Sequence, residues 1–426
     1  MHQHITIKDF PCGSGKTTSM IKEFSKESKY LVILPLLSEV DRVVKETRDV
    51  VFAQPSVDDN RLGLKSESLK ELLLTGQNIA TTHKMYEQLV PMVELGLLDD
   101  YNIIIDEVPE VVKAVSSLSK TSIRELYINT GFICIDESTG CVIPTEKWES
   151  NRKEVADTLK ANILTYAETG CLYLLEGQLF LWAMPSKLLL AGKSLTILTF
   201  KASGSVLLSY LKKLNIYPNI INNKINEEKF RKKAKELITI KEIPSISKLS
   251  LTYTSQIEGL NKISYYSKIF NALKNLRCRE LKSIPLENIL ITCLKAGWFK
   301  NNNSKNKLSG NFSRKSKIFN ANWVSNTTRG TNNYSHCSHL IYLYDQHINP
   351  LVGRWINDCS KQFNDRYALT ELIQWVWRSR IRKGEPITLY LPSSRMRDIF
   401  MDWIEDKKCK RYMNFTVKRF TFITTT

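Results

Sequence analysis

A glycine-rich segment near the N-terminus has the residue types and the spacing that bind phosphate. It lies between a strand-like run at residues 5–8 and a helix-like run at residues 19–26, and it reads Phe10-Pro11-Cys12-Gly13-Ser14-Gly15-Lys16-Thr17-Thr18. Glycines lack a Cβ atom, so backbone N–H groups can close around phosphate oxygens at the N-terminus of a helix. Lys16 can reach the outer phosphates, and the Thr17 hydroxyl can bind Mg²⁺. We predict that residues 11–18 bind a nucleoside triphosphate.

Two carboxylates further along the chain supply what a phosphate loop requires. Three isoleucines in Tyr101-Asn102-Ile103-Ile104-Ile105-Asp106-Glu107 indicate a buried parallel strand. At its end, Asp106 would hold Mg²⁺, and Glu107 would be the general base that polarises the attacking water. A second segment, Phe132-Ile133-Cys134-Ile135-Asp136-Glu137, has the same outline, but Ser138-Thr139-Gly140 follows it and indicates a hairpin turn. Asp106 is favoured, and Asp136 remains the alternative.

Further strands must position these groups. Residues 30–34 form a short apolar run that ends at Pro35, an amphipathic stretch follows at residues 38–50, and a second strand ends in Thr81-Thr82-His83. Alternating strands and helices at this spacing predict a parallel, doubly wound α/β sheet. The strand ends then line one edge of that sheet, where functional loops collect.

The order of these segments resembles motifs I, Ia, Ic and II of superfamily 2 helicases. The sequence is similar to the DEAD/DEAH-like helicases that phages, prophages and plasmids encode. This resemblance implies two RecA-like parallel-sheet domains, with ATP and Mg²⁺ at the phosphate loop. It also implies that Pro35, Thr81, Thr82 and His83 contact nucleic acid. The segment Phe200-Lys201-Ala202-Ser203-Gly204-Ser205, which follows a strand at residues 194–199, looks like motif III.

The second half of the chain contains segments similar to motifs IV and V. Residues 289–293 form a buried-type strand like motif IV, and Lys295 follows it. The segment Thr328-Arg329-Gly330-Thr331-Asn332 resembles motif V, with Asn332 where aspartate is usual. The resemblance implies that Gly330 and Asn332 bind the nucleotide. It implies that Lys295, Arg329 and Thr331 bind nucleic acid.

A third segment resembles motif VI and supplies cations for the γ-phosphate. It reads Gln374-Trp375-Val376-Trp377-Arg378-Ser379-Arg380-Ile381-Arg382, with Trp377 in place of the usual glycine and Ile381 where the final arginine is expected. On a continuous helix, Arg378 and Arg382 would be one turn apart on one face. We expect Gln374, Arg378 and Arg382 to be catalytic, because guanidinium groups stabilise the charge that develops during phosphoryl transfer.

Charge and composition indicate a polyanionic partner. The 426 residues carry a formal net charge of +18, and no acidic residue lies between Glu287 and Asp345. Cations interleaved with aromatic rings, here Trp298, Phe299 and Phe312, suit a single strand whose bases stack. We expect single-stranded or tailed DNA as the partner, with RNA as the alternative. No apolar run reaches 18 residues and no Cys-x-x-Cys pair occurs, so we expect an intracellular, cytoplasmic protein without a membrane partner. The resemblance to phage- and plasmid-encoded helicases implies that this is the cytoplasm of a bacterial host.

The length predicts more than one domain. We expect a first RecA-like domain at 1–214, with an inserted segment at about 116–185 that contains hairpins at 131–144 and 171–182. A linker at 217–235 would lead into a second RecA-like domain at 215–405, followed by a basic tail at 406–426. The expected function is an ATP-dependent helicase or translocase. The alternative is a nucleic-acid-stimulated ATPase that does not unwind, such as an origin-binding or packaging-type motor.

Overall fold

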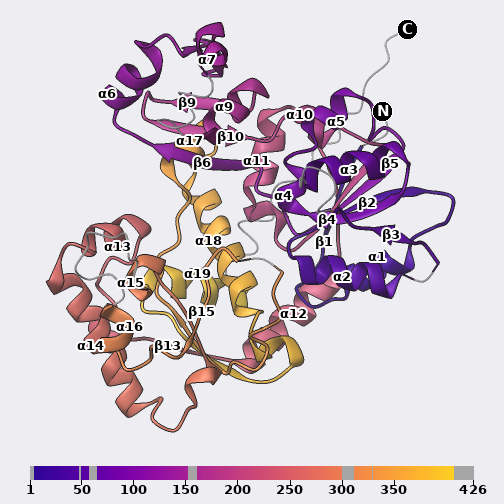
Figure 1. Ribbon diagram of the computed structural model, residues 1–426. Helices are drawn as coiled ribbons and strands as arrows, with labels where there is room; N and C mark the ends of the chain where they lie inside the picture. Colours follow the sequence, from indigo (N-terminus) through magenta and orange to yellow (C-terminus); the bar gives the residue numbers. More distant parts are fainter. Residues whose placement is uncertain are drawn as a thin grey trace, which may run out of the picture. The chain divides into compact units, whose positions relative to one another are not determined.

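The chain divides into two compact units. The computed structural model describes residues 4–47, 49–56, 65–151, 161–299, 311–328 and 330–406. Unit 1 comprises Met1–Lys224, Arg329–Thr331 and Ile348–Thr370, and unit 2 comprises Ile225–Thr328, Asn332–His347 and Glu371–Thr426. Figure 1 shows the helices and strands of both units. Whether the units are separately folding domains with the boundaries given above stays a prediction.

Unit 1 contains a seven-stranded sheet in which every pair of neighbouring strands is parallel. In spatial order, the strands are β12 (Asn219–Asn222), β1 (Ile5–Asp9), β11 (Ser194–Thr199), β5 (Tyr101–Asp106), β2 (Lys29–Leu34), β4 (Asn78–Thr82) and β3 (Phe52–Ala53). The strands predicted from apolar runs are confirmed. Because all strands point the same way, their carboxyl ends lie at one edge of the sheet.

Helices cover both faces of this sheet. On one face, α1 (Lys16–Lys22) and α2 (Leu37–Glu46) pack buried side chains against alternate residues of the strands. On the other face, the apolar sides of α3 (Lys65–Leu74), α4 (His83–Tyr86), α5 (Val90–Glu94), α10 (Ser186–Leu189) and α11 (Val206–Lys213) join a larger core. Burial on both faces explains why strands such as β2 are nearly continuous apolar runs.

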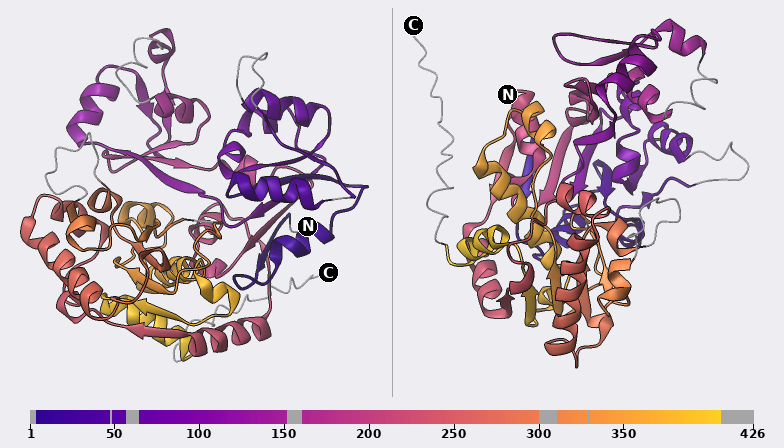
Figure 2. Two further views of the ribbon diagram at one scale, coloured as in Figure 1. Left: turned by 60° about the horizontal axis from the view of Figure 1, so that its bottom comes forward. Right: turned by 90° about the vertical axis from the view of Figure 1, so that its left-hand side faces the viewer.

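The segment between β5 and β11 is an insertion with strands of its own. Its antiparallel sheet has the order β6 (Val112–Ser117), β10 (Leu179–Ala183), β9 (Leu172–Leu175), and β7 (Ile133–Ile135) pairs with β8 (Val142–Pro144). Both predicted hairpins are confirmed, and the second turns at Glu176 and Gly177, which have φ values of 50° and 70°. The sheet begins at β6, slightly before the predicted start. Figure 1 labels α9 (Ala161–Glu168) and α7 (Glu146–Ser150) beside this sheet, and Figure 2 shows the insertion from two other sides.

A segment from the second half of the sequence belongs to unit 1. Val352 and Ile356, in and just after α17 (Pro350–Trp355), are buried in the main core of unit 1, as is Phe363 in α18 (Lys361–Val376). The ring of Trp355 stacks on Tyr210 at 5.7 Å between ring centroids. The predicted contiguous division of the chain did not include this return.

Unit 2 contains a five-stranded parallel sheet. Its order is β13 (Ile238–Lys241), β17 (Ile387–Tyr390), β16 (His339–Tyr342), β14 (Ile289–Thr292), β15 (Asn322–Trp323). Helices α14 (Ile263–Arg279) and α15 (Lys295–Trp298) contribute to a core on this sheet, and Leu251 and Leu260, which flank α13 (Tyr253–Gly259), also belong to it. The two parallel sheets and the inserted hairpins confirm the predicted fold class.

The stretch predicted as the linker and the entry to the second domain contains the change from unit 1 to unit 2 after Lys224, and it has regular structure. Residues 219–222 form β12, which pairs with the free edge of β1, and Lys224–Leu237 form α12. The Asn and Lys content of this stretch did not indicate regular structure. Both β12 and α12 are solvent-exposed over most of their length, so their residues are largely polar. Among the described residues, no helix has both the length and the apolar character needed to cross a membrane.

Candidate nucleotide and nucleic-acid site

The glycine-rich segment forms a loop between β1 and α1, as its sequence predicts. Gly13 and Gly15 have φ values of 75° and 79°, in the left-handed region that favours glycine. A Cβ atom on Gly15 would meet no atom within 4 Å. Glycine is therefore required there by the backbone conformation and not by a lack of space. The loop leads directly into the N-terminus of α1, with Gly15 as the residue before the helix, and a helix N-terminus is where an anion binds most favourably.

Lys16 and Thr17 make hydrogen bonds in different directions, one to the start of the loop and the other to the end of β5. Lys16 Nζ donates hydrogen bonds to the carbonyl oxygens of Phe10, at 2.9 Å, and Pro11, at 3.3 Å. Thr17 Oγ1 donates to Asp106 Oδ2 at 2.8 Å. The hydroxyl of the phosphate loop and the carboxylate at the end of β5 are thus in direct contact. Hydroxyl and carboxylate oxygens are the ligand types that Mg²⁺ prefers, so this pair fits the predicted metal.

Asp106 is buried and holds its proton more tightly than an ordinary carboxyl group. Burial raises its pKa from 3.8 to about 6, and the negative charge of Glu107 acts in the same direction. The hydrogen bond from Thr17 and the charge of Lys16 act against this shift. A divalent cation would add a strong opposing charge. The site therefore has a deficit of positive charge that a metal would correct.

Glu107 has a strained backbone and an unsatisfied side chain. Its φ is 66°, which is unfavourable for a residue with a Cβ atom. Its N–H donates to the Leu198 carbonyl oxygen at 2.8 Å, which fixes this conformation. Within the described part of the chain, its buried Oε2 has no hydrogen-bond partner. Strain and an unsatisfied acceptor at one residue are typical of a functional position.

The predicted nucleic-acid residues of unit 1 lie at the same edge of the sheet. Leu34, which precedes Pro35, is paired with Thr82, and β2 is also the neighbour of β5. His83 Nε2 lies 2.9 Å from the main-chain oxygen of Asp106. Thr81 is buried, whereas Pro35, Thr82 and His83 are half-buried. The structure therefore brings the predicted metal ligand and the predicted nucleic-acid residues together at the ends of nearby strands.

Asp136, the alternative carboxylate, has a structural role. Its Oδ1 accepts hydrogen bonds from the backbone N–H groups of Ser138, at 2.8 Å, and Thr139, at 3.0 Å, in the turn between β7 and β8. Hydrogen bonds from Ser138 and Thr139 lower its pKa. The side chain is committed to this turn, so the geometry favours Asp106.

Two acidic residues near the loop were missed by sequence reasoning. Asp9, the last residue of β1, accepts hydrogen bonds from the backbone N–H groups of Lys201 and Ala202. Glu39, in the first turn of α2, contributes to the raised pKa of Asp106 and is paired with Arg42 at 2.7 Å. An acidic residue directly before the phosphate loop was a signal for Asp9. No local pattern identified Glu39.

Motif VI of unit 2 differs from the predicted helix. Helix α18 ends at Val376, and Arg382 lies in a separate 3₁₀ helix, Arg380–Lys383. The N–H of Arg380 donates to the Cys337 carbonyl oxygen, which diverts the backbone from the helical path. The expectation that Arg378 and Arg382 share a helix face is therefore wrong. Gln374 and Arg378 are buried, and Arg382 is exposed.

The motif V segment is divided between the two units. Gly330, with φ of 68°, and the buried Thr331 belong to unit 1, and the exposed Asn332 belongs to unit 2. Arg329 lies outside the described residues. The predicted contact of Gly330 and Asn332 with nucleotide stays a prediction.

Part of the basic stretch lies in unit 2. Lys295 is the exposed first residue of α15. Trp298 is only 3% exposed and belongs to the core, so it cannot stack on a base as predicted. Phe299 remains 46% exposed. Residues 300–310 and the tail at 407–426 lie outside the described residues.

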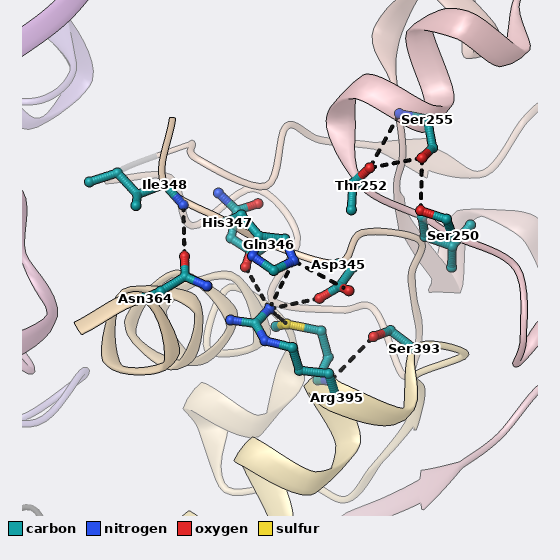
Figure 3. A network of polar contacts seen from close by, with 12 residues as sticks. Ser250, Thr252, Ser255, Asp345, Gln346, His347, Ile348, Asn364, Ser393 and Arg395 are labelled. Atoms are coloured by element: carbon teal, nitrogen blue, oxygen red, sulfur yellow. Dashed lines mark hydrogen bonds and ion pairs between the residues drawn. The ribbon is translucent and has the colours of Figure 1, made fainter. Parts of the chain in front are cut away.

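A polar cluster at the carboxyl edge of the second sheet was also missed. Arg395, in α19 (Ser394–Ile404), donates to Asp345 Oδ1 at 2.7 Å and to the Gln346 carbonyl oxygen at 2.9 Å (Figure 3). His347 Nε2 lies 3.4 Å from Asp345 Oδ2. Burial alone would raise the pKa of Asp345, but the hydrogen bonds from His347 and Arg395 lower it. Asp345 follows β16 and Arg395 follows β17, so the pair ties two neighbouring strands together.

The fold and the loop define a P-loop α/β chain with two parallel sheets. Residues 212–404 match the family model described as the YonV C-terminal Rossmann-like domain. Over 426 residues, the chain is 28% identical to the "SPbeta prophage-derived uncharacterized protein YonV" of Bacillus subtilis (strain 168), with 95% of this chain and 100% of the relative covered.

The solved structure with the higher of two TM-scores shares this fold. The chain is similar to a structure named "XPD_APO", with a TM-score of 0.54, 14% identity, and coverage of 94% of this chain and 95% of that one. "Structure of S. tokodaii Xpd4" matches with a TM-score of 0.49 and 12% identity over 94% of each chain. At such identities the likeness concerns the fold alone. It agrees with the fold that the sequence resemblance to helicases implied.

Proposed function

We propose that the chain is an ATP-dependent helicase or translocase that moves on single-stranded or tailed DNA, with RNA as a second candidate. The contact between Thr17 Oγ1 and Asp106 Oδ2 at 2.8 Å carries this proposal. It joins the hydroxyl of a phosphate loop to the carboxylate of a neighbouring strand, as triphosphate hydrolysis requires. The YonV relative, which its name assigns to a prophage, and the "XPD_APO" structure support it.

In this proposal, each candidate residue of unit 1 has a separate role in hydrolysis. The loop N–H groups would bind the phosphates, and Lys16 would exchange the carbonyl oxygens of Phe10 and Pro11 for phosphate oxygens. Thr17 and Asp106 would hold Mg²⁺, which when bound neutralises charge on the phosphates. Glu107 would accept a proton from the attacking water through its buried Oε2.

Nucleic acid can influence hydrolysis through adjacent strands. His83 contacts the main-chain oxygen of Asp106, and its neighbour Thr82 is paired with Leu34 of β2. A strand bound across Pro35 and Thr82 would therefore lie one residue from groups that hold the metal ligand. The excess of 18 positive charges favours such a partner.

ATP turnover with and without nucleic acid tests the proposal. We expect single-stranded DNA or RNA to raise turnover, and we expect Lys16→Ala to lower it about a hundredfold or more. Lys22→Ala, an exposed lysine in the last turn of the same helix, is the matched control. The proposal is refuted if the rate of ATP turnover is the same with and without nucleic acid and is also unchanged in Lys16→Ala. Strand displacement on tailed DNA and RNA duplexes then separates a helicase from an ATPase that does not unwind.

Glu107→Gln should lower ATP turnover by about a hundredfold or more, because the amide cannot accept the proton of water. ATP should still bind, since Glu107 does not belong to the phosphate loop. Single-turnover hydrolysis and binding of a fluorescent ATP analogue measure the two effects. Glu110→Gln, at an exposed position three residues further on, is the control. A variant with full turnover would remove Glu107 from the role of general base.

A further inference from the structure

A turn after β11 is stabilised by a carboxylate at the base of the phosphate loop. Asp9 Oδ1 accepts a hydrogen bond from the N–H of Lys201 at 2.7 Å, and Asp9 Oδ2 accepts one from the N–H of Ala202 at 3.0 Å. Lys201 has φ of 59°, which is unfavourable for a residue with a Cβ atom. The turn continues as the short 3₁₀ helix Ala202–Gly204. The carboxylate therefore compensates for backbone strain at this position.

The opposite side of the same turn contacts α18 at Arg366 and Thr370. Thr370 Oγ1 donates to the Lys201 carbonyl oxygen at 3.3 Å, and Arg366 Nε donates to the Ser203 carbonyl oxygen at 3.1 Å. A Cβ atom on Gly204 would lie 2.2 Å from Thr370 Oγ1 and 2.4 Å from the Arg366 carbonyl oxygen. The helix and the turn therefore approach so closely that only glycine fits. All these residues belong to unit 1.

The helix that rests on this turn also carries a residue of the proposed catalytic set. Arg366, Thr370 and Gln374 are spaced by four residues, so they lie along one side of α18. Arg378 follows two residues after the helix ends. Helix α18 is continuous from Lys361 to Val376, so Thr370 and Gln374 lie one turn apart on the same helix.

We infer that Asp9 is a positioning residue that links the strand of the phosphate loop to helix α18 through the Lys201–Gly204 turn. This inference rests on the proposed function. On one side of Asp9, the next residue, Phe10, provides the carbonyl oxygen that holds Lys16. On the other side, the turn sets the position of Thr370. A change at the loop therefore reaches the motif VI helix through hydrogen bonds at both ends of a short, strained turn.

A different result is expected if Asp9 only stabilises the turn and is not linked to α18. Such a contact would change the thermal stability when it is weakened, but the turnover of the folded enzyme would stay the same. A positioning residue changes kcat in the folded enzyme and leaves the KM for ATP nearly unchanged, because the phosphate loop itself is intact. The two readouts therefore separate the roles.

Asp9→Asn is the test variant, because asparagine has one acceptor oxygen and loses the second backbone contact and the charge. We expect nucleic-acid-stimulated kcat to fall about tenfold and the KM for ATP to stay within about twofold. Asp136→Asn is the matched control. Its carboxylate also caps a turn by accepting two backbone hydrogen bonds, but it lies in the insertion hairpin. Its kcat should equal that of the unmodified protein.

Thr370→Val tests the other end of the linkage without changing side-chain shape. We expect the same loss of kcat at constant KM, and we expect the double variant Asp9→Asn/Thr370→Val to lose no more than the stronger single variant, since both break one path. Independent, multiplying losses would overturn the inference, as would a folded Thr370→Val protein with full kcat. Thr370→Val decides the matter if Asp9→Asn does not fold. If the unmodified chain itself shows no ATP turnover, the proposed function fails first.

Discussion

Arg382→Ala should lower ATP turnover about a thousandfold or more while the melting temperature stays constant. Arg382 is exposed in the 3₁₀ helix Arg380–Lys383, so the core loses nothing when its guanidinium is removed. We propose that its charge, or that of Arg378, stabilises the γ-phosphate during hydrolysis. A cation of this kind is required only in the transition state, so kcat should fall more than the affinity for ATP changes.

Arg378→Ala should lower both turnover and stability. Arg378 is only 5% exposed, and its Nη2 donates to the Thr328 carbonyl oxygen. Its removal leaves the half-buried Thr328 without this hydrogen-bond donor and a cavity at the buried position of the arginine, which together cost about 2–4 kcal/mol. Single-turnover hydrolysis and thermal unfolding of both variants separate the roles of the two arginines.

Lys383→Ala, at an exposed cation in the same 3₁₀ helix, is the control for a general loss of charge. Loss of turnover in Arg378→Ala alone would assign the catalytic cation to Arg378. Full turnover in both arginine variants would remove the motif VI segment from the mechanism. These outcomes matter because sequence reasoning placed both arginines on one helix face, which the end of α18 at Val376 excludes.

The sequence was sufficient to predict a structural feature where the residues that form it lie close together in the chain. A phosphate loop needs a strand before it, a helix after it and glycines between, and all of these lie within residues 5–22. The isoleucines of β5 identify a strand buried on both faces, and its parallel neighbours place Asp106 at the edge that carries the loop. The hairpin turn at Glu176 and Gly177 is encoded by two adjacent residues.

It was insufficient where a distant partner determines the structure. The backbone turns away from helix α18 because Cys337, which is remote in sequence, accepts the N–H of Arg380. Trp298 looked available for stacking because it lies in a basic stretch without acidic residues, yet it is part of the core formed with α14. The return of residues 348–370 to unit 1 depends on apolar contacts with strands and helices that precede them by more than a hundred residues. No local pattern contains these contacts.

Asp106→Asn should abolish efficient hydrolysis and also stabilise the protein at neutral pH. Asparagine lacks the negative charge that holds Mg²⁺, so turnover should fall about a thousandfold or more. It can still accept the hydrogen bond from Thr17. The buried carboxylate, however, has a pKa raised from 3.8 to about 6, mainly by burial, so its ionisation disfavours the folded state. Each pH unit of that rise corresponds to about 1.4 kcal/mol, so the variant should gain up to about 3 kcal/mol at pH 7.5.

The gain should depend on pH in a defined direction. Well below pH 4, Asp106 is protonated in both the folded and the unfolded protein, and the variant has no advantage. Between pH 4 and 6 the unfolded chain releases its proton first, so the folded protein loses stability as the pH rises. Urea unfolding of unmodified and Asp106→Asn protein at pH 4, 5, 6 and 7.5 measures this. A variant that is less stable at pH 7.5, or equally more stable at pH 4, would contradict the assignment.

The same proton competes with the metal. We expect the apparent affinity for Mg²⁺ to fall about tenfold for each pH unit below about 6, because the protonated carboxyl group cannot bind the cation. Asp136→Asn is the control, since hydrogen bonds from Ser138 and Thr139 lower the pKa of that carboxylate and it lies away from the loop. In Mg²⁺ titrations of ATP turnover from pH 5 to 8, Asp136→Asn should show the same pH dependence as the unmodified protein, because it retains Asp106. Without a cation, the ionised Asp106 lowers the stability of unit 1. A bound cation would remove this loss of stability, so the burial of this carboxylate is best explained by metal binding.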